Sequence, residues 1–176
     1  GLWRSDGTEE GTVLVRSLRE LPDFLTPAGA RLFFVAPDED GSHELWVSDG
    51  TAAGTRPVTH FAAPRPFLQG SSADQAQPFF QDIDGVLHFL ADDVTGGLDL
   101  WRSDGTESGT RRVTTFGNAR PFSHAFERQI VKLGSRLLFI ATDGLTGLRL
   151  WASGGTPQTT AMVSGCPGGS CPTVEP

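Results

Sequence analysis

Acidic side chains gather in three short, glycine-containing segments of this sequence, and a metal ion is the ligand they indicate. The residues are Asp38, Asp40, Asp92, Asp93 and Asp143. Calcium binds carboxylate and carbonyl oxygens, but it takes about six to eight of them. Each segment supplies only part of such a shell. The sequence therefore predicts calcium as the candidate metal and indicates no other cofactor.

A second group of side chains has the chemistry to bind an organic ligand. The tripeptide Arg-Pro-Phe occurs at residues 65–67 and 120–122, with a histidine near each copy. Guanidinium and aromatic groups recognise both carbohydrate and protein surfaces. We therefore expect a binding face for a carbohydrate or a surface protein. Its candidate residues are His60, Arg65, Phe67, Arg120, Phe122 and His124.

Catalysis is less well supported. An enzyme would need a base and a nucleophile, or paired carboxylates, within mutual reach. The histidines His60, His88 and His124 lie in no catalytic motif. His88 lies in an apolar segment, which favours a buried histidine at a packing contact. A non-catalytic role is favoured, and a hydrolase or lyase stays an open alternative.

The two cysteines, Cys166 and Cys171, lie in a tail rich in proline and glycine at residues 165–176. Four flexible residues between them allow a small disulfide loop, which forms in an oxidising compartment. Two free thiols are the alternative. A zinc site would need two further ligands, and the tail has no histidine or aspartate to provide them. The favoured prediction is a disulfide between these two cysteines.

The elements that must position these residues are marked by a repeat. The dipeptide Leu-Trp occurs four times, as LWRSDGTEEGT, LWVSDGTAAGT, LWRSDGTESGT and LWASGGTPQTT, with tryptophans 43, 55 and 50 residues apart. Such spacing is typical of repeat architectures. Apolar segments at residues 31–36, 86–91 and 136–141 precede the last three copies. Their length and composition indicate buried strands.

Four antiparallel strands per repeat, joined by short turns, are typical of a β-propeller blade. Neighbouring Leu and Trp side chains point to opposite faces of a strand, so both are buried only where the sheet is covered on both sides. We predict an all-β, propeller-type array of about three and a half blades over residues 1–164. The half blade covers 1–18, and the blades cover about 19–61, 76–116 and 126–164. A β-sandwich is the structural alternative.

The SDGT sequence after each Leu-Trp connects the third and fourth strands of its repeat. Aspartate and serine accept hydrogen bonds from nearby backbone amides, and glycine allows a positive φ. Asp6, Asp49 and Asp104 are therefore predicted to cap their own turns, with metal coordination as the alternative. In the fourth copy Gly154 and Thr159 replace the aspartate and the second glycine, so we expect a looser turn.

These repeats resemble the ELWxxDGT-repeat proteins, a bacterial family of secreted or surface-attached chains. The segment HELWVSDGTAAGTRPV, at residues 43–58, matches the family pattern almost position by position, and the resemblance extends to about residue 164. The chain departs from the pattern at Gly1, Asp99 and Arg149, where the family has Glu, and in the fourth turn. The resemblance implies a propeller-like fold in an extracellular or cell-surface setting. It implies no catalytic residues.

Counting strands from the Leu-Trp motifs leaves the first pair without two partner strands. An isolated closed ring is therefore not expected, because open sheet edges and apolar faces favour association. Further propeller blades or another protein chain would complete the ring. In a four-stranded meander the acidic loops and the Arg-Pro-Phe connections lie on one face, and the SDGT turns lie on the other. Ligand recognition is expected on the first face, where the loops vary more.

Composition excludes two classes of partner. The 176 residues carry a net charge of −7 with both signs mixed, which argues against nucleic-acid binding. No apolar run approaches the roughly 18 residues of a membrane span. The sequence therefore predicts an extracellular, non-catalytic scaffold for binding or adhesion. A structural assembly subunit without a small ligand is the alternative.

Overall fold

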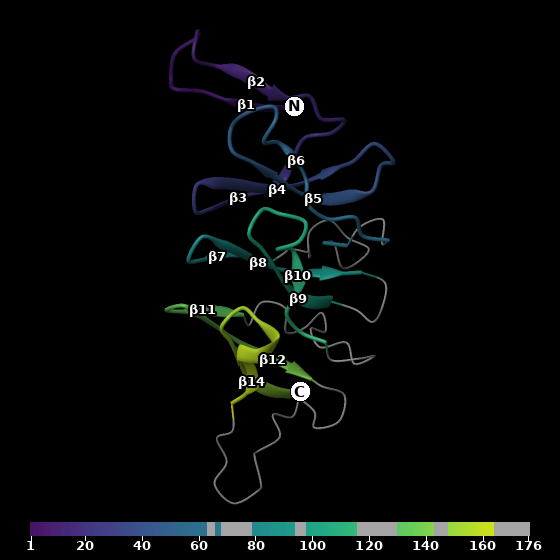
Figure 1. Ribbon diagram of the computed structural model, residues 1–176, viewed down its shortest axis with the longest axis vertical. Helices are drawn as coiled ribbons and strands as arrows, with labels where there is room; N and C mark the ends of the chain where they lie inside the picture. The colour runs from purple at the N-terminus through teal and green to yellow at the C-terminus, as the bar shows by residue number, and fades with distance from the viewer. Residues whose placement is uncertain (63–65, 68–78, 94–97, 116–129, 143–147, 164–176) are drawn as a thin grey trace, which may run out of the picture.

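The structure, a computed structural model of the 176-residue chain, describes residues 1–62, 66–67, 79–93, 98–115, 130–142 and 148–163. These residues form fourteen strands in four antiparallel sheets, with one turn of 3-10 helix, η1 (Pro157–Thr159). The strands of each sheet follow one another in chain order. Figure 1 shows the four sheets stacked in chain order along the long axis of the molecule.

Sheet 1 has two strands, and sheets 2, 3 and 4 have four each. Sheet 1 contains β1 (Leu2–Arg4) and β2 (Val13–Arg16). Sheet 2 contains β3 (Asp23–Ala28), β4 (Arg31–Pro37), β5 (His43–Ser48) and β6 (Arg56–Pro57). Sheet 3 contains β7 (Phe80–Ile83), β8 (Val86–Asp92), β9 (Leu98–Ser103) and β10 (Arg111–Arg112). Sheet 4 contains β11 (Val131–Leu133), β12 (Arg136–Thr142), β13 (Leu148–Ser153) and β14 (Thr160–Met162).

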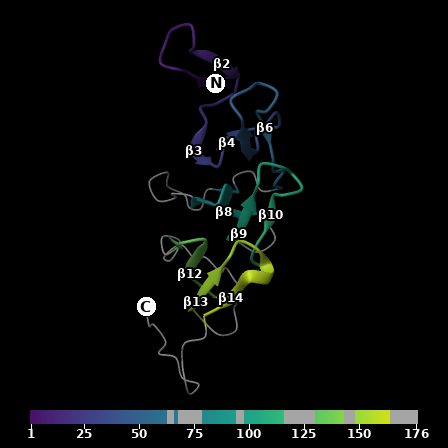
Figure 2. The ribbon, with the colours of Figure 1, turned by 60° about the vertical axis from the view of Figure 1, so that its left-hand side comes forward.

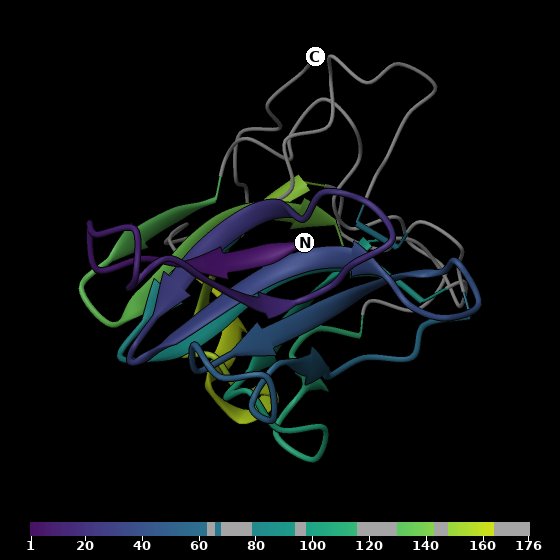
Figure 3. The ribbon, with the colours of Figure 1, turned by 90° about the horizontal axis from the view of Figure 1, so that it is seen from above.

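The predicted all-β class with four-stranded antiparallel sheets is confirmed. The sheets form an open column, as Figures 1 and 2 show from two sides. Seen from above in Figure 3, they lie over one another. The described segments contain no helix with the length and apolar character that crossing a bilayer requires.

The two side chains of a Leu-Trp dipeptide enter different cores, one on each face of their sheet. Leu45 and Trp46 are neighbours on β5, so their side chains point to opposite faces. Leu45 packs in a cluster with Phe89 of sheet 3, whereas Trp46 packs in a cluster with Leu2 and Val15 of sheet 1. We name the face toward the following sheet the forward face, and the face toward the preceding sheet the backward face.

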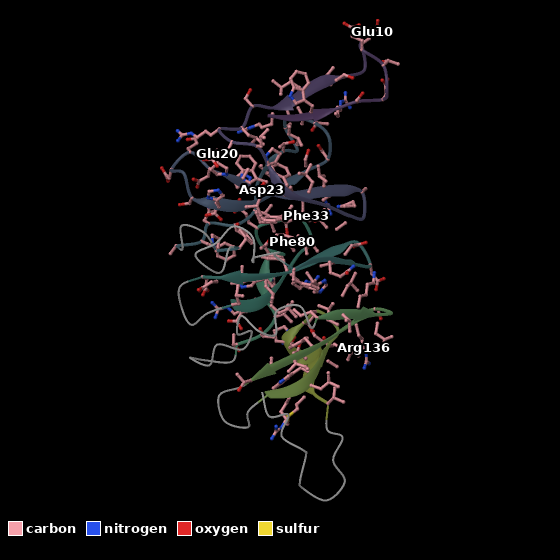
Figure 4. The ribbon with its side chains drawn as sticks, turned by 180° about the vertical axis from the view of Figure 1, so that it is seen from behind. Glu10, Glu20, Asp23, Phe33, Phe80 and Arg136 are labelled. Atoms are coloured by element: carbon pink, nitrogen blue, oxygen red, sulfur yellow. The ribbon has the colours of Figure 1, made fainter. Side chains whose placement is uncertain are left out.

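Aromatic rings fill the junction between sheets 2 and 3. Phe80 stacks on Phe24 and on Phe89, with 6.0 Å between ring centroids in both pairs. Phe33 lies close to Phe80 in this junction, as the view from behind in Figure 4 shows. Burying one such side chain stabilises a fold by about 1.5–3 kcal/mol. The junctions between sheets are therefore the hydrophobic cores that hold the stack together.

Candidate functional site

The aspartate of each SDGT sequence holds the turn between the last two strands of its sheet. In sheet 3, Asp104 Oδ1 accepts hydrogen bonds from the Thr106 amide (2.9 Å) and the Thr106 hydroxyl (2.7 Å). The Gly109 amide donates to Thr106 Oγ1 at 2.9 Å. Sheets 1 and 2 repeat these bonds, and the threonine hydroxyl holds the pKa of all three aspartates below the ordinary value. The predicted capping role of these aspartates is confirmed.

The fourth turn differs from the others by a paired exchange of residues, and it contains the 3-10 turn η1. A Cβ added at Gly109 would overlap the carboxylate of Asp104, so the second glycine of each SDGT turn makes room for the aspartate. In sheet 4 Gly154 removes that carboxylate, and Thr159 occupies the space. Thr159 Oγ1 accepts the Thr156 amide at 3.2 Å and lies 2.8 Å from the Thr156 hydroxyl. The serine and threonine bonds at the two ends of the turn persist, whereas the Thr159 amide donates to the Thr156 carbonyl (3.1 Å) instead of to its hydroxyl. The fourth turn is therefore hydrogen-bonded in a changed arrangement, and its looseness stays a prediction.

A buried carboxylate lies directly before Leu-Trp in sheets 2 and 3. Glu44 accepts the Thr59 hydroxyl at 2.6 Å and the Phe61 amide at 3.0 Å, which fastens the segment after β6 to β5. In sheet 3 Asp99 Oδ1 accepts the Thr114 hydroxyl at 2.8 Å. Burial raises the pKa of both acids, that of Asp99 to about 6. The role of these two acids was not predicted, although the sequence places an acid directly before a buried leucine in both repeats.

The predicted calcium ligands lie in separate loops. Asp38 Oδ1 accepts the amides of Asp40 (2.9 Å) and of a nearby serine (3.1 Å), so it holds its own loop together. Asp92 is the last residue of β8, and Asp93 forms an ion pair with Arg112. Within the described parts of the chain, no three His, Cys, Asp or Glu side chains are grouped to hold a metal.

Two of the predicted ligand-binding residues are described, and they differ in their surroundings. Phe67 is only 3% exposed, and its ring contacts Phe61 and Phe89 in the junction between sheets 2 and 3. It therefore packs the core and offers no surface to a ligand. His60 is exposed and lines a cavity. The other predicted site residues lie outside the described residues: Arg65, Arg120, Phe122, His124, Asp143, Cys166 and Cys171.

The cavity that His60 lines has a volume of about 430 Å³ and lies between sheets 2 and 3. Its wall contains Trp101 together with His60, a predicted ligand-binding residue, and Asp93, a predicted calcium ligand. Trp101 Nε1 is buried and has no hydrogen-bond partner among the described residues. In the neighbouring sheets Trp46 and Trp151 each donate to a backbone carbonyl, at 3.0 and 3.2 Å. The Trp101 indole therefore keeps an N–H donor that has no partner in the described part of the chain.

Arg112 links Asp93 in the cavity wall to Asp99, the buried carboxylate of sheet 3. Its guanidinium lies over the Trp101 ring, 5.3 Å from the centroid. It forms ion pairs with Asp93 and, at 3.4 Å, with Asp99. Trp101, His60 and the ion-paired Asp93 give the cavity a mixed aromatic and polar wall, the kind of lining that binds a ligand rich in hydroxyls, such as a carbohydrate. Neither Trp101 nor Arg112 was predicted as a ligand-binding residue, because their proximity to this cavity depends on how sheets 2 and 3 pack.

Comparison with known protein families finds no match, and comparison with curated proteins finds none. Among solved structures the chain is similar to an α-L-arabinofuranosidase from Clostridium thermocellum, with 11% sequence identity and a TM-score of 0.32. The likeness covers 80% of this chain and 49% of that enzyme, so the chain spans about half its length. A likeness at this level carries no argument about activity.

Proposed function

We propose that this chain is a non-catalytic module for binding or adhesion, of the ELWxxDGT type, that works outside a bacterial cell. Each sheet is a blade of a β-propeller in this proposal. Further blades or a partner chain complete the ring. The observation that carries the proposal is the exposure of the two end faces of the stack.

The end faces expose side chains that internal junctions bury. Trp3, on the backward face of sheet 1, is 59% exposed, whereas Trp46 at the same position of sheet 2 is 6% exposed. Leu150, on the forward face of sheet 4, is 45% exposed, whereas Leu45 and Leu100 are 0% exposed. Each internal junction joins a forward leucine face to a backward tryptophan face. The two end faces therefore complement one another, and another blade of the same pattern would cover either.

The binding role is supported by the cavity beside Trp101. A carbohydrate or a surface protein is the ligand that its indole, histidine and ion-paired groups fit. Binding is favoured over catalysis because the repeated carboxylates hold the protein itself together. Asp104 closes a turn, Glu44 fastens the segment after β6, and Asp99 is paired with Arg112.

A structural assembly subunit without a small ligand is the second candidate. It is favoured by the strict repetition of residues whose bonds are all internal. A glycan array separates the two candidates. Binding that is lost in Trp101→Leu and kept in Trp3→Leu supports the ligand-binding role. An array without any signal favours the assembly role.

Sedimentation velocity tests whether the end faces join. Trp3→Asp blocks one end and Leu150→Asp blocks the other, while each variant keeps one intact end. We expect each variant alone to be monomeric and an equimolar mixture to form a dimer, because the intact faces fit head to tail. Leu21→Asp, which changes a loop leucine that is 78% exposed, is the control and should associate like the unchanged chain. A mixture that does not associate would contradict the proposed junction.

A further inference from the structure

The junction between sheets 3 and 4 carries two polar side chains where the neighbouring junction carries two apolar ones. On the forward face of sheet 2, Phe33 is opposite Val47 across the strands, and both are buried. The corresponding positions of sheet 3 hold His88 and Arg102, again opposite one another. The apolar packing between sheets 2 and 3 is therefore interrupted between sheets 3 and 4.

Two arginines that join sheets 2 and 3 have no equivalent between sheets 3 and 4. Arg31 and Arg56 of sheet 2 donate to backbone carbonyls in the turn of sheet 3, at 2.7 and 2.9 Å. The corresponding residues of sheet 3 are Val86, which has no donor group, and Arg111, whose Nε donates to its own turn. The turn of sheet 4 is therefore not clamped in this way to sheet 3.

A cavity of about 580 Å³ lies at this junction, on the side of the SDGT turns. Its wall includes Arg102 and Arg136, the hydroxyl-bearing Ser135 and Thr159, and Asp84. Figure 4 labels Arg136, the first residue of β12, where the turn from β11 enters the strand. Neither arginine forms an ion pair with another residue in the described part of the chain. The charged side chains at the wall thus sum to one positive unit.

His88 lines this cavity, and its Nε2 lies beside Gly155 in the turn of sheet 4. The side chain is 3% exposed, and Nδ1 lies 3.1 Å from the Val86 carbonyl. Since a carbonyl only accepts, Nδ1 carries the proton and Nε2 is an acceptor. Nε2 is buried and has no partner among the residues that the structure describes. Burial lowers the pKa of His88, and the charge of Arg102 lowers it further, so the imidazole is neutral at pH 7.

We propose that this cavity binds a small organic acid that also carries hydroxyl groups, such as a uronic acid. The carboxylate pairs with Arg102 and Arg136, and a hydroxyl donates to His88 Nε2. A single carboxylate balances the net charge of the wall, and the volume is that of a small-molecule site. Gly154 lines the cavity where the other turns carry an aspartate, so no carboxylate of this turn competes for the arginines. This site is separate from the cavity beside Trp101 and does not depend on it.

Calorimetric titration of the full chain with sodium glucuronate, sodium acetate and glucose tests the proposal. We expect glucuronate to bind about fivefold or more tightly than acetate, because only glucuronate provides a donor for His88. Glucose should give no binding heat, because it lacks the carboxylate. Arg102→Val should weaken glucuronate binding by about tenfold or more. His88→Phe should weaken glucuronate binding and leave acetate binding unchanged.

Arg102→Val and His88→Phe introduce the residues that sheet 2 has at the corresponding positions. We therefore expect both variants to have melting temperatures at or above that of the unchanged chain. Arg102→Lys keeps the charge without the planar fork and should give intermediate affinity. Arg19→Val, at an exposed loop position, is the control and should bind like the unchanged chain. The proposal is overturned by the absence of glucuronate binding at about 10 mM. It is also overturned if Arg102→Val keeps full affinity, or if acetate or glucose binds as tightly as glucuronate.

Discussion

The paired exchange in the fourth turn predicts an energetic coupling between two positions of the other turns. In sheet 3 these positions are Asp104 and Gly109. The backbone of Gly109 lies outside the left-handed region, so glycine is required there to leave room for the Asp104 carboxylate. We therefore consider three variants: Asp104→Gly, Gly109→Thr and the double variant that combines them. The double variant reproduces the arrangement of Gly154 and Thr159.

Asp104→Gly removes the acceptor of two hydrogen bonds, and such a loss destabilises by about 0.5–2 kcal/mol. The added glycine contributes about 0.5–1 kcal/mol through the entropy of the unfolded chain. Gly109→Thr displaces the carboxylate and loses the same bonds. Asp104→Gly should thus destabilise by about 1–3 kcal/mol, and Gly109→Thr by about 0.5–2 kcal/mol. In the double variant the new threonine takes the role of Thr159, so we expect a coupling energy of about 1–2 kcal/mol.

Urea unfolding measures these free energies, provided that far-UV circular dichroism and tryptophan fluorescence give coincident transitions. The matched control combines Asp104→Gly with Gly54→Thr, which lies in the turn of sheet 2. Because these positions belong to different turns, their effects should add within about 0.5 kcal/mol. If the effects of Asp104→Gly and Gly109→Thr on the free energy of unfolding also add in their double variant, the reasoning is refuted. The carboxylate would then not compete with the side chain at position 109.

Three further predictions concern charge and burial. The folded pKa of Asp99, about 6, lies above the ordinary value of 3.8, so protonation favours the folded state. The contribution of Asp99 to the free energy of unfolding should therefore rise by about 2 kcal/mol as the pH falls from about 7 to 4. Urea titrations should show a change over this pH range that is smaller by about that amount in Asp99→Asn, since Glu44 and the SDGT aspartates titrate in both proteins. Trp46→Ala should lower the free energy of unfolding by about 3–5 kcal/mol and Trp3→Ala by less than about 1 kcal/mol, because only Trp46 is buried. Equal losses of the free energy of unfolding in Trp3→Ala and Trp46→Ala would show that the backward face of sheet 1 is covered. Millimolar calcium should leave the melting temperature unchanged, because Asp93 is already paired with Arg112; a clear increase would show that the acidic loops assemble a metal site.

Much of the fold could be predicted because its signals are short in range. The alternation at Leu45 and Trp46 predicts that both faces of a sheet are covered, and the two side chains do enter separate cores. The capping role of Asp104 could be predicted because its partner is two residues away. Phe67 shows the limit of this reasoning. An aromatic side chain in a connecting segment resembles a binding group in the sequence, but the packing of sheets 2 and 3 buries it.

By itself the sequence determined the repeat, the strands and the turn chemistry, because hydrogen bonds and side-chain alternation within a repeat involve residues close together in the chain. Only the tertiary structure decided which polar residues meet across a junction. His88 lies in an apolar strand and Arg102 follows a Leu-Trp motif, and neither position has a chemical meaning alone. They line a cavity with Arg136 because the apolar pair of sheet 2 is replaced here and the facing turn lacks its aspartate. Contacts between residues far apart in the chain set the environment of a side chain, and local sequence does not contain that information.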